Sequence, residues 1–182
     1  MSVNFHARAT LGLAAADPAR LSVRSQTDQS HLEGFTGHWT GFGRTLYHPD
    51  PIQRLRGIQS FHMSPGGLGT THGAGDIAYN FAFDRDGNVY ELRDAKWNGA
   101  HALSPNNNAN RLTLGAVWLE DARGWGPGCN SAVEWLANLF RLTRNRKATW
   151  FDHNWWARQN GQGTECSGSD FRTVIRYVGG RV

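Results

Sequence analysis

The chain has 182 residues, a length that fits one domain and leaves enough chain to bury a core. Hydrophobic residues make up 39% and charged residues 19%, and no run of about 18 apolar residues argues for a transmembrane helix. The net charge of +4 suits either simple solubility or attraction to a polyanion. The nearest approach to a dense Lys/Arg block is Arg141–Lys147, which we interpret as a helix end that favours the helix dipole, so nucleic acid is not the expected partner.

The first 32 residues are expected to be an N-terminal extension that packs on a single domain spanning 1–182. The segment Ala9–Ala16 faintly imitates the apolar part of a secretion signal, but it is short and Asp17 follows at once. We interpret it as mature protein, with no signal peptide. Residues 17–32 are polar and are expected to form a loop.

Helices and strands then alternate along the chain. Asp50 and Pro51 form a helix start, with Asp as N-cap and Pro at the first helical position. The periodicities predict a strand over 35–40, a helix over 51–63, a hairpin over 79–92 that turns at 84–87, a central strand over 112–119, a helix over 130–142, a strand over 148–151 and a helix over 170–178. This pattern predicts an α/β fold with a mixed β-sheet.

The stretch 152–166 (DHNWWARQNGQGTEC) places one His and one Cys in a polar, Gly-rich segment, which we expect to be a loop. Zinc takes His and Cys ligands, and catalytic zinc sites leave one position for water. His153 and Cys166 supply two ligands, and His38, on a predicted strand, is the best third candidate. A disulfide between Cys129 and Cys166 is the competing interpretation.

Several stretches resemble the zinc-dependent N-acetylmuramoyl-L-alanine amidases, a family that spans phage lysozyme-type amidases and peptidoglycan recognition proteins. The matching stretches keep the family's order and cover most of residues 5–170: Gly37–Gly41, Ile58–Met63, Asp76–Phe81, Asp84–Glu91, Trp97–Ala102 and Thr164–Gly168. The resemblance implies a central mixed β-sheet flanked by helices, with a zinc groove on one face.

The resemblance also implies roles for individual residues. It places the ligands of one zinc ion at His38, His153 and Cys166, and catalytic roles at Tyr79 and Thr164. Cys129 is then expected to be a free thiol, because a disulfide through Cys166 would destroy the site. Substrate contacts are expected from a further set: His101, Trp39, Trp97 and Asn80. For His101 a proton shuttle and a structural role behind the ligands are the alternatives.

Some positions depart from the family's pattern. Ser167 stands where Pro is usual, which is expected to loosen the loop after the ligand, and Asp152 stands where Gly is common before the second His. Val117 occupies the position of a general-base Glu found in a subset of these enzymes, which favours the Tyr-type arrangement. Arg93 is expected either to meet a carboxylate of the stem peptide or to form a surface salt bridge.

The resemblance implies an enzyme that cleaves the amide between N-acetylmuramic acid and L-alanine in peptidoglycan. A phage endolysin is the expected setting: a monomer without a separate wall-binding domain or membrane insertion, held in the host cytoplasm until release to the cell wall. The alternative is a recognition domain that binds peptidoglycan without cutting it. A regulatory partner of another protein is a third hypothesis.

The net charge leaves the polyanionic partner open, because an anionic cell-wall polymer fits the basic charge as well as nucleic acid does.

Overall fold

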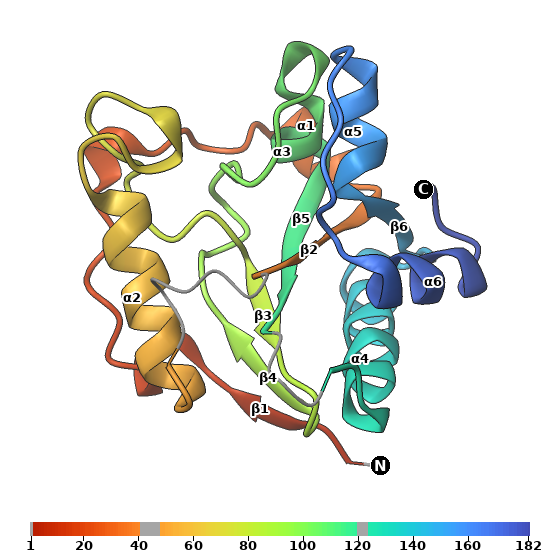
Figure 1. Ribbon diagram of the computed structural model, residues 1–182. Coiled ribbons are helices and arrows are strands. Elements are labelled where there is room, and N and C mark those ends of the chain that lie inside the picture. Colours follow the sequence, from red (N-terminus) through yellow and green to blue (C-terminus); the bar gives the residue numbers. More distant parts are fainter. Residues whose placement is uncertain (1, 41–47, 120–123) are drawn as a thin grey trace.

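The computed structural model describes residues 2–40, 48–119 and 124–182, and in these residues six strands form one sheet in the order β1-β4-β3-β5-β2-β6 (Figure 1). The strands are β1 (Asn4–His6), β2 (Gly34–Trp39), β3 (Phe81–Phe83), β4 (Asn88–Glu91), β5 (Thr113–Trp118) and β6 (Thr149–Asp152). Only the β3–β4 hairpin is antiparallel, and the other neighbouring pairs are parallel. The predicted α/β fold with a central mixed sheet is confirmed.

The helices flank this sheet, and α2 begins where the sequence predicts, with the Asp50 side chain accepting a hydrogen bond from the Ile52 N–H at 2.9 Å. The helices are α1 (Gln26–Ser30), α2 (Pro51–Met63), α3 (Asn108–Leu112), α4 (Pro127–Arg144), α5 (His153–Gln159) and α6 (Ser169–Tyr177), with short 3-10 turns at Arg8–Thr10, Pro18–Arg20, Gly67–Gly69 and Pro105–Asn107. No helix in the described ranges has the length and apolar character needed to cross a bilayer.

Side chains alternate between the two faces of the sheet and form separate cores. On β5, Ala116 and Trp118 join the larger core beneath α4 and α6, whereas Val117 joins the core beneath α2. A third cluster, which includes Phe151 and Trp156, lies beneath α5. The face of the sheet that carries Val117 is therefore covered by α2 at one side and by α3 and α5 at the other (Figure 1).

Two segments expected to be loops contain helix instead. In residues 17–32, Ser25 caps α1 by accepting a hydrogen bond from the Asp28 N–H at 3.0 Å. In residues 152–166, His153 begins α5, because burial of Asn154, Trp156 and Ala157 holds that turn against the sheet. The short strand β1 was not predicted, since three residues are too few for a periodic signal.

Candidate metal centre

His38 reaches the candidate site through the alternation of β2. Phe35 belongs to the core beneath α4 and α6, so His38, three residues on, faces the opposite side of the sheet. It is opposite Val117 in the β2–β5 register and is only 1% exposed. Gly41, which closes the first family-like stretch, lies outside the described residues.

His153 and Cys166 join His38 because β6 runs parallel to β2 and His153 follows β6 directly. The His38 and His153 ring centroids are 4.5 Å apart, and Cys166 Sγ lies 3.6 Å from His38 Nδ1. One ligand atom from each of the three residues lies within 4.8 Å of the others. The structure therefore brings together a group that could hold a metal ion.

The distances in this group fit a tetrahedral zinc site. Zn–N and Zn–S bonds of typical length at a tetrahedral angle put the two ligand atoms roughly 3.5 Å apart, close to the separation of His38 Nδ1 and Cys166 Sγ. The buried Nδ1 of His153 has no hydrogen-bond partner among the described residues, as expected for a nitrogen reserved for a metal. Three protein ligands leave a fourth position for water or substrate.

The electrostatics of the three residues favour neutral side chains when no metal is bound. Burial and the neighbouring histidines lower the pKa of His38 well below its usual value, and burial lowers the pKa of His153. Burial likewise raises the pKa of the Cys166 thiol to about 12. Metal binding at this group would therefore release the thiol proton, because a thiolate is the ligand form.

Asp152 holds the Cys166 segment in place. In the sequence it stands out only as a departure from the family pattern. Its buried carboxylate accepts hydrogen bonds from the Ser167 N–H at 3.1 Å, from the Ser167 hydroxyl at 2.9 Å and from Arg172 Nε at 2.8 Å. The expectation that Ser167 loosens this loop is therefore wrong. Because the three residues lie on β6, the loop and α6, only tertiary structure could reveal this arrangement.

His101 supports His38 from the other side. Its Nδ1 lies 3.1 Å from His38 Nε2, so if His38 uses Nδ1 for a metal, its Nε2–H donates to His101. The ring fits a slot between Gly99 and Gly115, where an added Cβ would lie 2.4 and 2.7 Å from His101 Cδ2. Asn110 Oδ1 accepts from the His101 N–H at 2.8 Å, which fixes the loop that carries the ring.

Tyr79 and Thr164 lie beside the metal ligands. The Tyr79 ring centroid is 5.1 Å from that of His38, and burial together with Cys166 raises the pKa of Tyr79, so its hydroxyl stays protonated and can donate. Thr164 Oγ1 accepts a hydrogen bond from the Cys166 N–H at 3.2 Å, which leaves its own O–H free to donate. Both side chains thus offer hydrogen-bond donors near the metal ligands.

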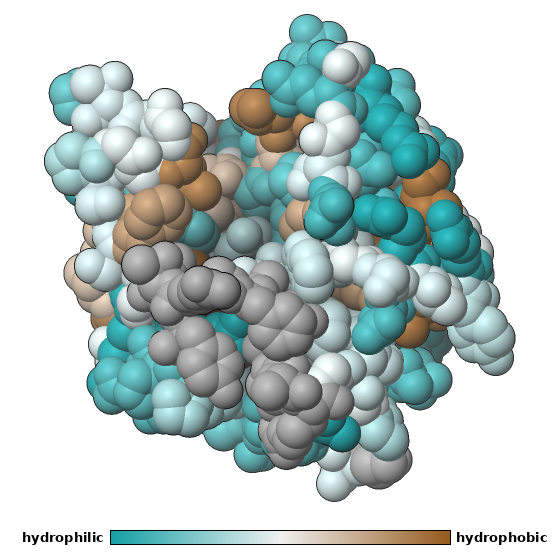
Figure 2. Space-filling model, in the orientation of Figure 1, coloured by the Kyte–Doolittle hydropathy of each residue, from teal (hydrophilic) through white to brown (hydrophobic). Residues whose placement is uncertain are grey.

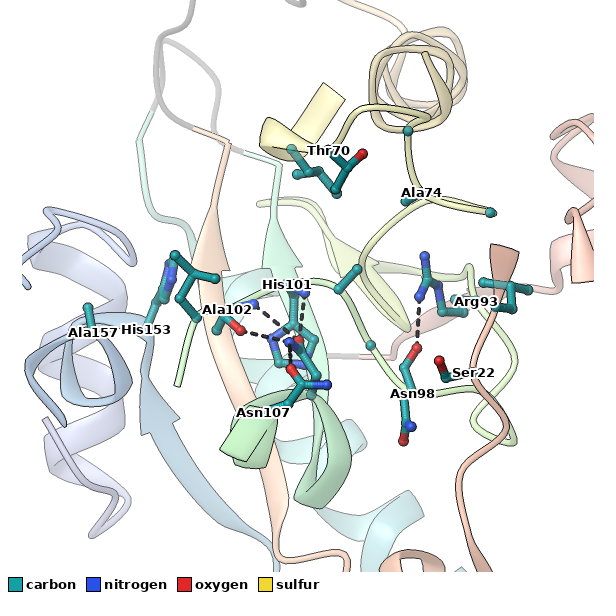
Figure 3. A pocket seen from close by; sticks show the side chains of 18 of the residues that line it. Ser22, Thr70, Ala74, Arg93, Asn98, His101, Ala102, Asn107, His153 and Ala157 are labelled. Atoms are coloured by element: carbon teal, nitrogen blue, oxygen red, sulfur yellow. Dashed lines mark hydrogen bonds between the residues drawn. The ribbon is translucent and has the colours of Figure 1, made fainter. Parts of the chain in front are cut away.

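A groove of about 550 Å³ is lined by one candidate metal ligand, His153, together with Thr164 and His101 (Figure 2). In Figure 3, Thr70 and Ala74 lie on one side of it and His153 and Ala157 on another, with His101 between them. His101 Nε2 is buried there without a hydrogen-bond partner among the described residues. Because His101 Nδ1 can accept from His38, this Nε2 is the protonated nitrogen and offers a donor to a bound ligand.

The other expected substrate contacts lie elsewhere. Trp39 packs against the core and Gly168, Trp97 pairs with Val23, and neither lines the groove. Asn80 is fully buried, and its amide bonds the Gly115 N–H and the Arg93 carbonyl, so the structure places it in the framework of the fold.

Arg93 also differs from expectation. It is only 3% exposed and donates to the backbone carbonyls of Ile77, Asp76 and Asn98. The predicted surface salt bridge is wrong, because the guanidinium lies in the wall of the groove and joins loops there through backbone carbonyls (Figure 3). Cys129 and Cys166 form no disulfide, as predicted, and Cys129 is buried in the first turn of α4, where its Sγ donates to the Asp84 carbonyl at 3.7 Å.

Solved structures share this fold along nearly the whole chain. The Drosophila peptidoglycan recognition protein PGRP-LB aligns with a TM-score of 0.73 at 20% identity, covering 96% of this chain and 93% of that one. A chain from the ectodomain complex of PGRP-LCa and PGRP-LCx with tracheal cytotoxin aligns with a TM-score of 0.75 at 21% identity. The alignment covers 99% of this protein and 99% of that chain. The fold and the His-His-Cys group define an α/β protein of the peptidoglycan-recognition fold with a potential metal site in its groove.

Sequence relatives identify the family, although no protein-family model matches the chain. Peptidoglycan-recognition protein SC2 of Drosophila simulans is 31% identical over 137 residues, which cover 68% of this chain and 71% of the relative. The SC2 protein of Drosophila melanogaster matches over the same length with the same identity. The chain belongs to the peptidoglycan-recognition protein family.

Proposed function

We propose that this protein is a zinc-dependent N-acetylmuramoyl-L-alanine amidase, which hydrolyses the amide between N-acetylmuramic acid and the L-alanine of the stem peptide. One observation carries the proposal: His38, His153 and Cys166 converge within 4.8 Å, with a groove beside them. A human N-acetylmuramoyl-L-alanine amidase supports it, with 42% identity over 53 residues, which cover 29% of this chain and 8% of that protein.

Each residue of the site can be given a separate role in amide hydrolysis. His38, His153 and Cys166 would hold one zinc ion, which when bound lowers the pKa of a coordinated water towards about 7 and polarises a carbonyl. Tyr79, which stays protonated, would donate a hydrogen bond to the negative charge that develops on the amide oxygen. Thr164 would offer a second donor. Val117 has a hydrocarbon side chain and cannot act as a base.

The second candidate function is recognition of peptidoglycan without cleavage. It is favoured by the match to the SC2 recognition proteins, which covers 68% of this chain, and by a solved structure of the same fold in complex with tracheal cytotoxin. The complete ligand set favours cleavage, because a domain that only binds has no need for a buried thiol aimed at two imidazoles.

We further propose a phage endolysin as the setting. The protein would act as a monomer on bacterial peptidoglycan, and it would stay in the host cytoplasm until release to the cell wall. Lysis of host cells on expression together with a membrane pore-former, and no lysis without it, would support this setting.

Digestion of purified peptidoglycan with and without a zinc chelator tests the reaction. We expect new L-alanine amino termini that disappear with the chelator and return with added zinc, and no new reducing sugar ends. Zinc binding without any cleavage would favour the recognition function. New reducing ends would identify a glycosidase and contradict the proposed site.

A further inference from the structure

The densest run of basic residues in this chain is Arg141–Lys147, which we call the basic segment. The chain has 19 Lys and Arg against 15 Asp and Glu, and four of the 19 lie in these seven residues without any acid. The remaining 15 basic residues match the 15 acidic ones, so the net charge of +4 equals the charge of the basic segment. Such clustering is different from a positive charge spread over the surface.

The basic segment is accessible and free of ion pairs. Arg141, Arg146 and Lys147 are exposed and Arg144 is half-buried. Within the described ranges none of the four forms a salt bridge. Leu142, between the two helical arginines, is 74% exposed.

Stabilisation of the helix end accounts for only half of these charges. Arg141 and Arg144 occupy the last turn of α4, where cations interact favourably with the helix dipole. Asn145 then adopts a left-handed conformation (φ 52°) and ends the helix. Arg146 and Lys147 follow that cap, beyond the turn on which the dipole acts, so their charges need another explanation.

The topology places the basic segment at the opposite end of the sheet from the metal ligands. It directly precedes β6, whereas His153 directly follows β6, and His38 lies near the end of the parallel neighbour β2. Four strand residues span about 13 Å, so a ligand on the basic segment leaves the groove open. Figure 1 shows α4 leading into this end of β6.

We infer that the basic segment is a docking surface for a phosphate-bearing polyanion of the bacterial cell envelope, which holds the enzyme on the wall while the groove works on peptidoglycan. The inference rests on the proposed function for its choice of partner. Four unpaired cations on one edge suit a polymer with repeated phosphates, because each Lys or Arg can neutralise one phosphate and release its counterion.

Binding to purified bacterial walls tests the inference, using walls with their phosphate polymers and the same walls after chemical removal of those polymers. The variant R146Q/K147Q removes two charges from the basic segment. The control R158Q/R176Q removes two exposed charges from α5 and α6, so both proteins have the same net charge. We expect R146Q/K147Q to bind native walls about tenfold more weakly, the control to bind within about twofold of wild type, and stripped walls to bind all three equally.

Equal losses in both variants would show that only net charge matters and would overturn the inference, as would unchanged binding of R146Q/K147Q. Tighter binding to duplex DNA or to phosphatidylglycerol vesicles than to native walls would also overturn it, in favour of those partners. Cleavage of a small soluble muropeptide, which carries no polymer, tests the proposed activity separately. A failure there with wall binding intact would reject the amidase and not the docking surface.

Discussion

Burial raises the pKa of the Cys166 thiol, so the thiol stays protonated unless a bound metal ion replaces the proton. We expect Cys166→Ser to lose bound zinc and activity together, with metal affinity lower by at least about 100-fold. Elemental analysis after dialysis and the wall-digestion assay measure both effects.

Cys129→Ser is the matched control for this variant. It removes the other thiol, which lies in the first turn of α4 and outside the ligand group, so this variant should keep one zinc ion per chain. A Cys166→Ser protein that retains stoichiometric zinc would exclude Cys166 as a ligand.

Tyr79 offers a hydroxyl that stays protonated beside His38. Tyr79→Phe keeps the ring and removes only this donor, so we expect unchanged zinc content and a value of kcat lower by about 10²–10³-fold. Zinc content together with kcat and KM on a soluble muropeptide measures the effect. A full rate in this variant would remove Tyr79 from the mechanism.

At the scale of elements, the candidate site depends on the link between β6, α6 and the loop that carries Cys166. Asp152 makes this link with a side chain that is fully buried, and Arg172 meets it with a side chain that is 24% exposed. The carboxylate therefore ties one candidate metal ligand, His153, to the segment that carries another, Cys166.

Asp152→Ala would leave the Ser167 N–H and hydroxyl buried without their acceptor. We expect the free energy of unfolding to fall by about 2–4 kcal/mol and zinc affinity to fall with it. Urea unfolding and a chelator competition measure the two quantities. Asp170→Ala is the control, because Asp170 is exposed on α6. Its removal should lower the free energy of unfolding by less than about 1 kcal/mol. Equal stability of the two variants would contradict this role for Asp152.

At the scale of the whole molecule, the buried histidines make stability depend on pH. Burial lowers the pKa of His62 to about 4, and its Nδ1 accepts from the Ala78 N–H at 3.0 Å, a bond that protonation would break. In the unfolded chain His62 takes up a proton near about pH 6.5, whereas in the folded protein it stays neutral down to a lower pH. The contribution of His62 to the free energy of unfolding is therefore present above about pH 6.5 and is lost as the pH falls. His38, His101 and His153 shift in the same direction.

We therefore expect the metal-free protein to lose stability between pH 7.5 and pH 5, by about 2 kcal/mol from His62 alone. Urea unfolding of the chelator-treated protein across this range measures the slope. His62→Asn should flatten the slope, whereas His31→Asn, at an exposed position, should leave it unchanged. A stability that is constant over this range would contradict the prediction.

The sequence by itself determined the regular elements and the family. The cap at Asp50, the apolar run over 112–119 and the hairpin turn at 84–87 are local signals, and local physics is enough to interpret them. The order of family-like stretches pointed to His38, His153 and Cys166 before their geometry was known. Short elements such as β1 and α5 are not predicted from the sequence, since their stability comes from packing and not from a periodic pattern.

Only the tertiary structure decided which polar side chains line the groove and which support the fold. Asn80 and Trp97 look like surface contacts in the sequence, yet neither lines the groove: Asn80 binds the Gly115 N–H and Trp97 pairs with Val23. In the sequence Asp152 is only a departure from the family pattern. In the structure its carboxylate binds Ser167 and Arg172 and so holds the segment that carries Cys166. The reason is physical: a buried polar group takes its role from the partners that satisfy its hydrogen bonds, and folding alone brings those partners to it.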